Sequence, residues 1–118
     1  MLSKEHRLRN DKDIKTLFAK GKGVFGFNVN IKYRPNGLQI SRFAVVVGTK
    51  VSKKAVVRNR LKRQIRAIVF KHLKNFRPGF DVVFMPKKEA IGGKSLKFEE
   101  EVLRNLKQKT RILKASYY

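Results

Sequence analysis

The stretch that decides the fold is KKAVVRNRLKRQIRAIVFKHLK, residues 53–74, which lies between the apolar runs FAVVV (43–47) and FDVVFM (80–85). Apolar residues recur in it with helical spacing, because one arc of a helix would carry Val57, Leu61, Ile65, Ile68 and His72. Both flanking runs have the β-branched and aromatic residues of buried strands, and we expect the first, over 40–48, at the centre of the sheet. The order strand, helix, strand predicts a sheet covered by a helix.

Further elements are predicted on both sides of this unit. Residues 27–33 alternate apolar and polar side chains as a half-buried strand does, and RPNG (34–37) indicates a turn. A first helix is expected from a cap at Asn10 or Asp11 to Gly21, and a last helix from a cap at Ser95. We therefore predict one domain over residues 1–118 of the α/β (α+β) class. It is an α/β sandwich in the order helix-strand-strand-helix-strand-helix, with a mixed sheet packed by helices.

The charge balance points to a polyanionic partner. The chain has 30 Lys and Arg against 8 Asp and Glu, a net charge of +22, and no acid from Ile14 through Phe80. With 42% hydrophobic residues it has the material for a core, which a disordered basic tail lacks. Nucleic acid is favoured over an anionic membrane or an acidic protein. The chain has no cysteine and no apolar run long enough to cross a bilayer, so we expect a cytoplasmic protein without a membrane partner.

The densest charge lies on the central helix. Seven of the fourteen residues from Lys53 to Arg66 are basic and none is acidic. Arg58, Lys62 and Arg66 are spaced by four, so they follow one line with steps of about 6 Å, close to the spacing of phosphates along an RNA strand. The alternative is a solvated helix face, but such faces normally mix charges of both signs. We predict that RNA lies along this line.

The same segment carries a resemblance. Residues 57–66, VRNRLKRQIR, resemble the R-N-R-x-K-R-x-x-R helix of the bacterial ribonuclease P protein subunit family. The similarity extends to HRLR (6–9), to the valine-rich strand ending at Gly48, and to GFDVV (79–83). In that family the RNA, with bound magnesium, hydrolyses the phosphodiester. The resemblance implies a non-catalytic protein subunit without a cofactor of its own, which assists removal of the 5′ leader of precursor tRNA.

The resemblance also implies site residues by position. The catalytic RNA would be bound by Arg58, Asn59, Arg60, Lys62, Arg63 and Arg66, with Lys50, Lys53 and Lys54 as neighbouring phosphate contacts. A leader-binding cleft would lie between the first helix and the sheet, lined by Ile14 and Phe18 and by Phe27 or Tyr33. Ordinary core packing is the alternative for these four residues, and for Ile14 it is favoured. No metal ligand is assigned, and nothing in the sequence indicates an oligomeric state.

Other functions are weighed against this one. A protein-only nuclease needs clustered carboxylates or a paired acid and base, whereas Asp11, Asp13 and Asp81 and the two histidines are scattered along the chain. A DNA-architectural protein usually has minor-groove arms or apolar wedges, and neither is found. A structural RNA-binding protein, such as a small ribosomal protein, shares the charge and the build, and it stays the alternative.

Overall fold

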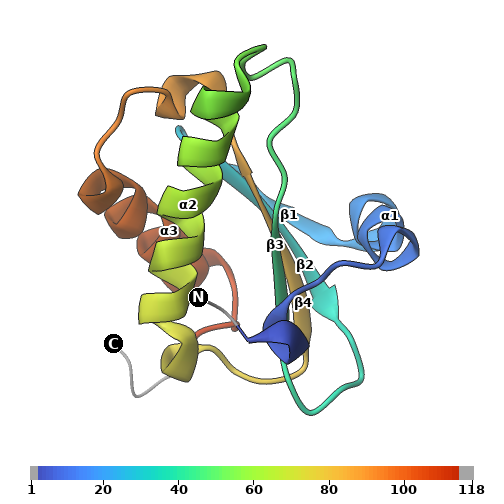
Figure 1. Cartoon of the computed structure of the whole chain (residues 1–118). Coiled ribbons are helices and arrows are strands. Elements are labelled where there is room, and N and C mark those ends of the chain that lie inside the picture. Colours follow the sequence, from blue (N-terminus) through green and yellow to red (C-terminus); the bar gives the residue numbers. More distant parts are fainter. Residues whose placement is uncertain (1–2, 115–118) are drawn as a thin grey trace.

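A four-stranded mixed sheet in the order β1-β2-β4-β3 forms the middle layer of the protein, which a computed structural model describes for residues 3–114 (Figure 1). The strands are β1 (Lys22–Val24), β2 (Val29–Pro35), β3 (Arg42–Val45) and β4 (Phe80–Pro86). β1, β2 and β4 are antiparallel neighbours, while β3 is parallel to β4. A parallel pair needs a crossover, and the basic helix supplies it.

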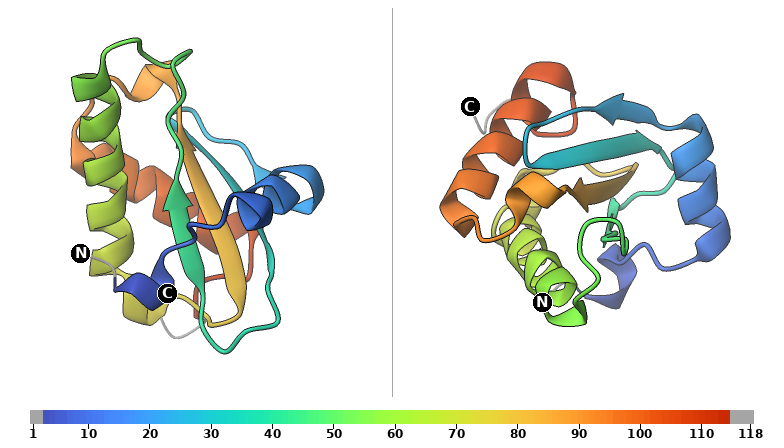
Figure 2. Two further views of the ribbon diagram at one scale, coloured as in Figure 1. Left: turned by 45° about the vertical axis from the view of Figure 1, so that its right-hand side comes forward. Right: turned by 90° about the horizontal axis from the view of Figure 1, so that it is seen from above.

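Three α-helices cover the two faces of the sheet. α1 (Asp11–Lys20) lies on one face, and α2 (Ala55–Lys71) and α3 (Ser95–Lys109) lie on the other (Figure 1; Figure 2). Short 3-10 turns occur at Lys4–His6, Leu73–Asn75 and Lys88–Ala90. The predicted class, the mixed sheet and the order of elements are confirmed. The one additional element is β1, whose three residues are too few to show an alternation.

The alternation of β4 divides the core between the two faces. Val82 and Phe84 are fully buried in the larger cluster under α2 and α3, whereas Val83 is fully buried in a smaller cluster with Leu8 and Leu17 under α1. Successive strand side chains point to opposite faces, so β4 contributes to both cores. β4 is therefore the central strand that both layers of helices cover.

The structure corrects the prediction for the strand at 40–48. β3 is shorter than predicted and is an edge strand, not the centre of the sheet. Its outer side is covered in part by residues 7 and 8, since Arg7 forms a β-bridge with Phe43 and Leu8 N donates to Phe43 O at 2.8 Å. A β-branched run reports burial of side chains, and here the N-terminal segment and the helices supply that burial without a second neighbouring strand.

The caps of the helices follow from local chemistry. Asn10 Oδ1 accepts from the backbone N of Lys12 at 2.9 Å and of Asp13 at 3.4 Å, so the predicted cap of α1 at Asn10 is confirmed. The N-cap residue of α3 is Lys94, and Ser95, the predicted cap, is the first residue of the helix. Helix α1 ends at Gly21 as predicted.

Candidate nucleic-acid interface

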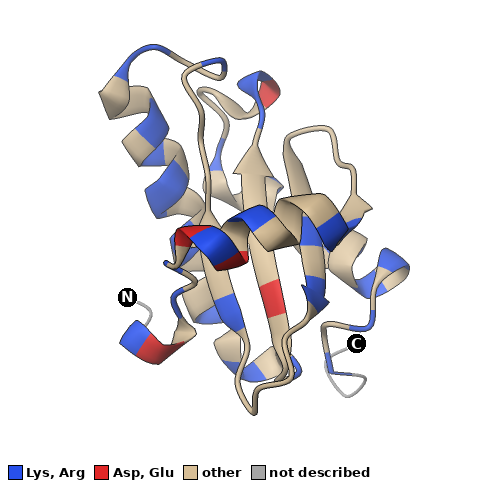
Figure 3. Cartoon of the chain, turned by 90° about the vertical axis from the view of Figure 1, so that its right-hand side faces the viewer, with Lys and Arg blue, Asp and Glu red and all other residues tan. Residues whose placement is uncertain are grey.

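The outer face of α2 is a line of cations that no acid interrupts. Leu61, Ile65, Ile68 and Val69 are buried against the sheet and α3, and this orientation turns the motif side chains outward. Four motif residues are exposed and two are half-buried: Asn59, Arg60, Arg63 and Arg66 are exposed, and Arg58 and Lys62 are half-buried. Figure 3 shows Lys and Arg but no acid along this helix. The helix is therefore suited to a polyanion on the side away from the core.

The segment before α2 adds cations at the positive end of the helix. Lys50, Lys53 and Lys54 are all exposed, and Lys54 is the N-cap residue. Arg58 Nη1 donates to the carbonyl of Ser52 at 2.9 Å, and the backbone N of Lys54 donates to Ser52 Oγ at 3.2 Å. Cations at this end of a helix are unfavourable for an isolated helix, because its dipole is positive there. A bound phosphate would relieve that repulsion.

The second predicted part of the interface lies between α1 and the sheet. Ile14 and Phe18 are half-buried there and pack with Ala44, Val46 and Met85 beside the smaller core. Leu17 between them is fully buried, so one face of α1 is fixed on the sheet while its neighbours border solvent. Ile14 and Phe18 are thus placed where a cleft between α1 and the sheet requires them, and their binding role stays a prediction.

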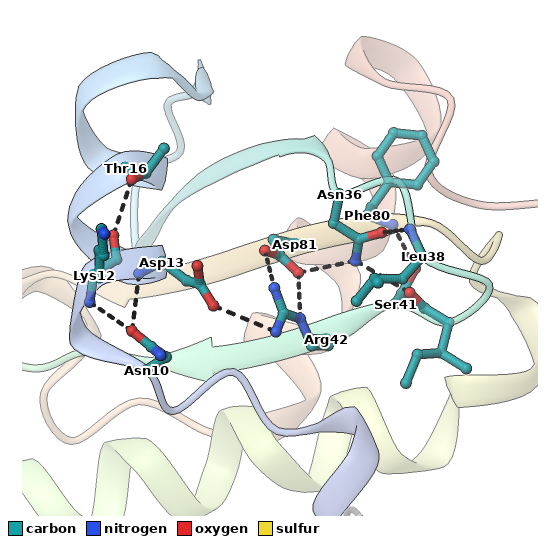
Figure 4. A network of polar contacts seen from close by, with 11 residues as sticks. Asn10, Lys12, Asp13, Thr16, Asn36, Leu38, Ser41, Arg42, Phe80 and Asp81 are labelled. Carbon is teal, nitrogen blue, oxygen red and sulfur yellow. Dashed lines mark hydrogen bonds and ion pairs between the residues drawn. The ribbon is translucent and has the colours of Figure 1, made fainter.

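A polar clamp holds α1 over the sheet (Figure 4). Arg42 of β3 donates from Nε to Asp81 Oδ1 at 2.9 Å and from Nη2 to Asp81 Oδ2 at 2.7 Å, and its Nη1 lies 3.4 Å from Asp13 Oδ2 of α1. Asn36 Nδ2 donates at 2.9 Å to Asp81 Oδ1, the oxygen that also accepts from Arg42 Nε. The hydrogen bonds to Asp81 raise the pKa of Arg42 above its ordinary value. Arg42 is thereby committed to the scaffold and sets the position of α1.

The structure does not bring Phe27 or Tyr33 to α1. Tyr33 packs against the larger core on the opposite face, with its ring 6.3 Å from that of Phe80. Phe27 is 71% exposed in the loop between β1 and β2, where the backbone N of Asn28 binds Glu101 of α3. The predicted contribution of these two residues to a cleft beside α1 therefore does not match the geometry.

Lys32 is the β2 residue that lies beside α1. Its Nζ donates to the carbonyl of Phe18 at 2.6 Å and lies 5.8 Å from the centroid of the Phe18 ring. The alternation of β2 accounts for this, because Lys32 is opposite Val83, whose side chain lies under α1, and Tyr33 must face the other way. The sheet side of the cleft thus presents a cation next to an aromatic ring.

A pocket of about 300 Å³ connects the two parts of the interface. It lies at the outer edge of β3, and its lining includes Ile14 of α1 and Arg66 of α2. Arg7 and Arg9 also line it, which places two further arginines beside the motif helix. The sequence motif HRLR contained these residues, but only the bridge between Arg7 and Phe43 shows that they reach the edge of β3.

The acids of the chain are largely engaged within it. Glu101 is buried and accepts from the backbone N of Val29 at 2.9 Å. Glu99 lies 2.9 Å from His72 Nε2 and 3.2 Å from Lys71 Nζ. The hydrogen bond with His72, and then that with Lys71, holds the pKa of Glu99 below its ordinary value of 4.5. Across residues 3–114 there is no cluster of three or more His, Asp or Glu that could hold a metal ion, and no helix with the length and apolar character to cross a bilayer.

This fold and interface define a class: a small, basic α/β protein that binds RNA. Residues 2–110 match the family described as Ribonuclease P. The chain is 40% identical over 102 residues to the ribonuclease P protein component of Synechocystis sp., covering 86% of this chain and 82% of that protein. It is 44% identical over 87 residues to that of Petrotoga mobilis, covering 73% and 72%. The chain belongs to the ribonuclease P protein family.

Solved structures agree with this assignment. The RNase P protein from Thermotoga maritima is 32% identical and superimposes with a TM-score of 0.78 over 86% of this chain and 96% of that one. The RNase P protein of Staphylococcus aureus, at 21% identity, shares the fold with a TM-score of 0.81 over 92% of this chain and 98% of that one. The resemblance seen in the motif helix is confirmed at the level of family and fold.

Proposed function

We propose that this chain is the protein component of ribonuclease P, which binds the catalytic RNA through α2 and assists the RNA in removing the 5′ leader of precursor tRNA. Family membership implies the RNA partner, and the geometry supports the division of roles. The observation that carries the proposal is that the acid-free face of α2 and the cleft beside α1 share one pocket, between Arg66 and Ile14.

The motif helix is suited to structured RNA. Arginine forks bind phosphate oxygens in a bidentate manner, and lysines neutralise them as point charges. Arg60 and Arg63 are exposed and have no acid on their own helix, so their guanidinium groups are available to a partner. Asn59 adds an amide that both donates and accepts, which suits a base edge or a ribose hydroxyl.

The cleft is suited to a single strand. The half-buried ring of Phe18 offers an apolar surface on which a base can stack, and stacking accepts any base, as leaders of different sequence require. Lys32 places an ammonium group beside that ring for a backbone phosphate. A strand leaving the cleft past Ile14 would meet Arg66 and then the RNA bound on α2.

The chemistry of bond cleavage is assigned to the RNA partner and its magnesium. In this proposal the chain supplies binding and orientation, while the general acid, the general base and the metal ligands belong to the RNA partner. The internal engagement of Asp81 and Glu101 supports this division. The alternative, a structural ribosomal protein, is not favoured by the family match.

Reconstitution tests the proposal. The purified chain is combined with a bacterial ribonuclease P RNA at a magnesium concentration at which the RNA alone cleaves precursor tRNA poorly, and release of the leader is measured. We expect cleavage at the mature 5′ end with the protein and RNA together, and none with the protein alone. Failure with several bacterial RNAs, with the protein shown to be folded by circular dichroism, would favour the ribosomal alternative. Cleavage by the protein alone would contradict the non-catalytic role.

A further inference from the structure

A second basic pocket lies at the opposite edge of the sheet from α2. It has a volume of about 650 Å³ and is lined by residues from the end of α1, from β1, β2 and β4, and from the end of α3 and the segment after it. The pocket that joins α1 to α2 lies at the other edge of the sheet, at β3. The two pockets share no lining residue, and neither Lys32 nor Phe18 lines the second one.

The lining of the pocket combines cations with aromatic rings. Five of its ten residues are basic and none is acidic. The cations come from four elements and the segment that follows α3: Lys20, Lys22, Arg34, Lys109 and Arg111. Its aromatic walls are Tyr33 and Phe80, whose rings meet edge to face at 6.3 Å. Tyr33 is half-buried and lines the pocket.

We propose that this pocket is a second RNA-binding site that takes a single-stranded segment. Its cations suit backbone phosphates, and its rings suit unstacked bases, which is the pairing of groups that binds single strands without sequence preference. Its volume is that of a site for one or two nucleotides rather than for a duplex. A partner protein would need acidic side chains next to a protruding apolar side chain, whereas every nucleotide of RNA carries both a phosphate and a base.

Binding of a short fluorescent oligouridine, of about ten nucleotides, tests the site by anisotropy on the protein alone. The site variant is Lys22→Gln with Lys109→Gln and Arg111→Gln. The control removes the same charge from exposed residues elsewhere: Lys74→Gln, Lys97→Gln and Arg104→Gln. We expect the Kd to rise about tenfold in the site variant and less than about twofold in the control, with a salt slope reduced by about 2 in the site variant alone. Equal losses in the two variants would overturn the proposal.

A second variant leaves every charge in place. Tyr33→Leu, which keeps an apolar side chain at the pocket wall but removes the ring, should weaken oligouridine binding by about fivefold or more, the lower end for loss of one stacked base. Leu96→Ala, an exposed apolar control on α3, should leave binding unchanged. Crosslinking with a thiouridine-substituted oligonucleotide locates the strand. Crosslinks at residues 33–35, at Phe80 or at residues 108–111 support the site, and crosslinks confined to Lys32, to residues 11–18 and to α2 overturn it. None of these measurements uses the catalytic RNA, so their outcome is independent of the reconstitution.

Discussion

At the scale of single residues, the contact between Lys32 and Phe18 shows which features of a strand can be predicted from its sequence and which cannot. The alternation of β2 predicts that residues 32 and 33 face opposite sides, and it does so correctly. It does not state which side α1 covers, because that depends on the path of the chain through β1. The resemblance, which implies Phe27 or Tyr33 at the sheet side of the cleft, does not settle this either, and Lys32 is the residue found beside Phe18.

Phe18 is the residue on which the leader cleft can be tested. Phe18→Ala should weaken binding of precursor tRNA to the reconstituted holoenzyme by about 1–3 kcal/mol, the contribution of one base stacked on an aromatic ring. Mature tRNA has no leader, so its affinity should stay within about twofold of that of the unchanged protein. Both affinities are measured on the same preparation by gel filtration or anisotropy.

Phe18→Leu is the matched control, because it keeps apolar packing against the cluster of Leu8, Leu17 and Val83 but removes the ring. Precursor binding that falls with leucine as it falls with alanine indicates stacking. Equal losses for precursor and mature tRNA would show that Phe18 serves only the core beneath α1.

At the scale of elements, α2 was predictable because three signals coincide in it. The buried arc of Leu61, Ile65 and Ile68 sets the orientation of the helix, and the motif indicates that its partner is RNA. Because the helix has no acids, its cations are not neutralised by residues of the same helix. The position of β3 was not predictable, because its neighbour in the sheet, β4, follows it by a whole helix. The two basic pockets were missed for the same reason, since each is assembled from segments far apart in the sequence.

The charge line of α2 can be measured through salt. Arg60→Ala and Arg63→Ala should each weaken binding of the catalytic RNA and reduce the slope of log K against log salt by about 0.9, the value for one lost phosphate contact on a duplex. Lys97→Ala, which removes an exposed cation from α3, is the control and should leave the slope unchanged. Affinity and slope that do not change in either arginine variant would contradict the assignment of this face.

The packing of α2 on α3 should depend on pH through Glu99. Its pKa is lowered in the folded protein, so its contribution to stability is complete above the ordinary value of about 4.5 and is lost as the pH falls through the lower folded value. Glu99→Gln should therefore lower the free energy of unfolding by about 1 kcal/mol or less near neutral pH, and the difference should shrink below about pH 4. Urea unfolding at several pH values measures it, with the exposed neighbour Glu100→Gln as control. A difference that grows on acidification would contradict the role of Glu99.

At the scale of the whole molecule, the net charge of +22 acts on every element at once. Like charges repel one another in the folded state, and the repulsion is strongest where cations gather, along α2 and the residues before it. Internal acids offset little of it, since Asp81, Glu99 and Glu101 are engaged in holding elements together. Anions supplied from outside should therefore stabilise the fold.

Sulfate is a probe for that dependence, because it resembles a phosphate group and binds the folded protein in preference to the unfolded chain. At a concentration of about one hundred times its Kd, a single bound anion adds about 2.7 kcal/mol, which raises the Tm of a domain of this size by roughly 10 °C. Sulfate also stabilises proteins by exclusion from their surface, an effect that does not depend on particular arginines.

The informative comparison is therefore between this chain and an Arg60→Gln, Arg63→Gln variant, each melted in sulfate and in chloride at equal ionic strength. We expect the Tm in sulfate to exceed the Tm in chloride by less in the variant than in the unchanged protein, because the variant has lost cations of the α2 face. The same difference in Tm between sulfate and chloride in both proteins would mean that the charge of α2 does not limit the stability of the fold.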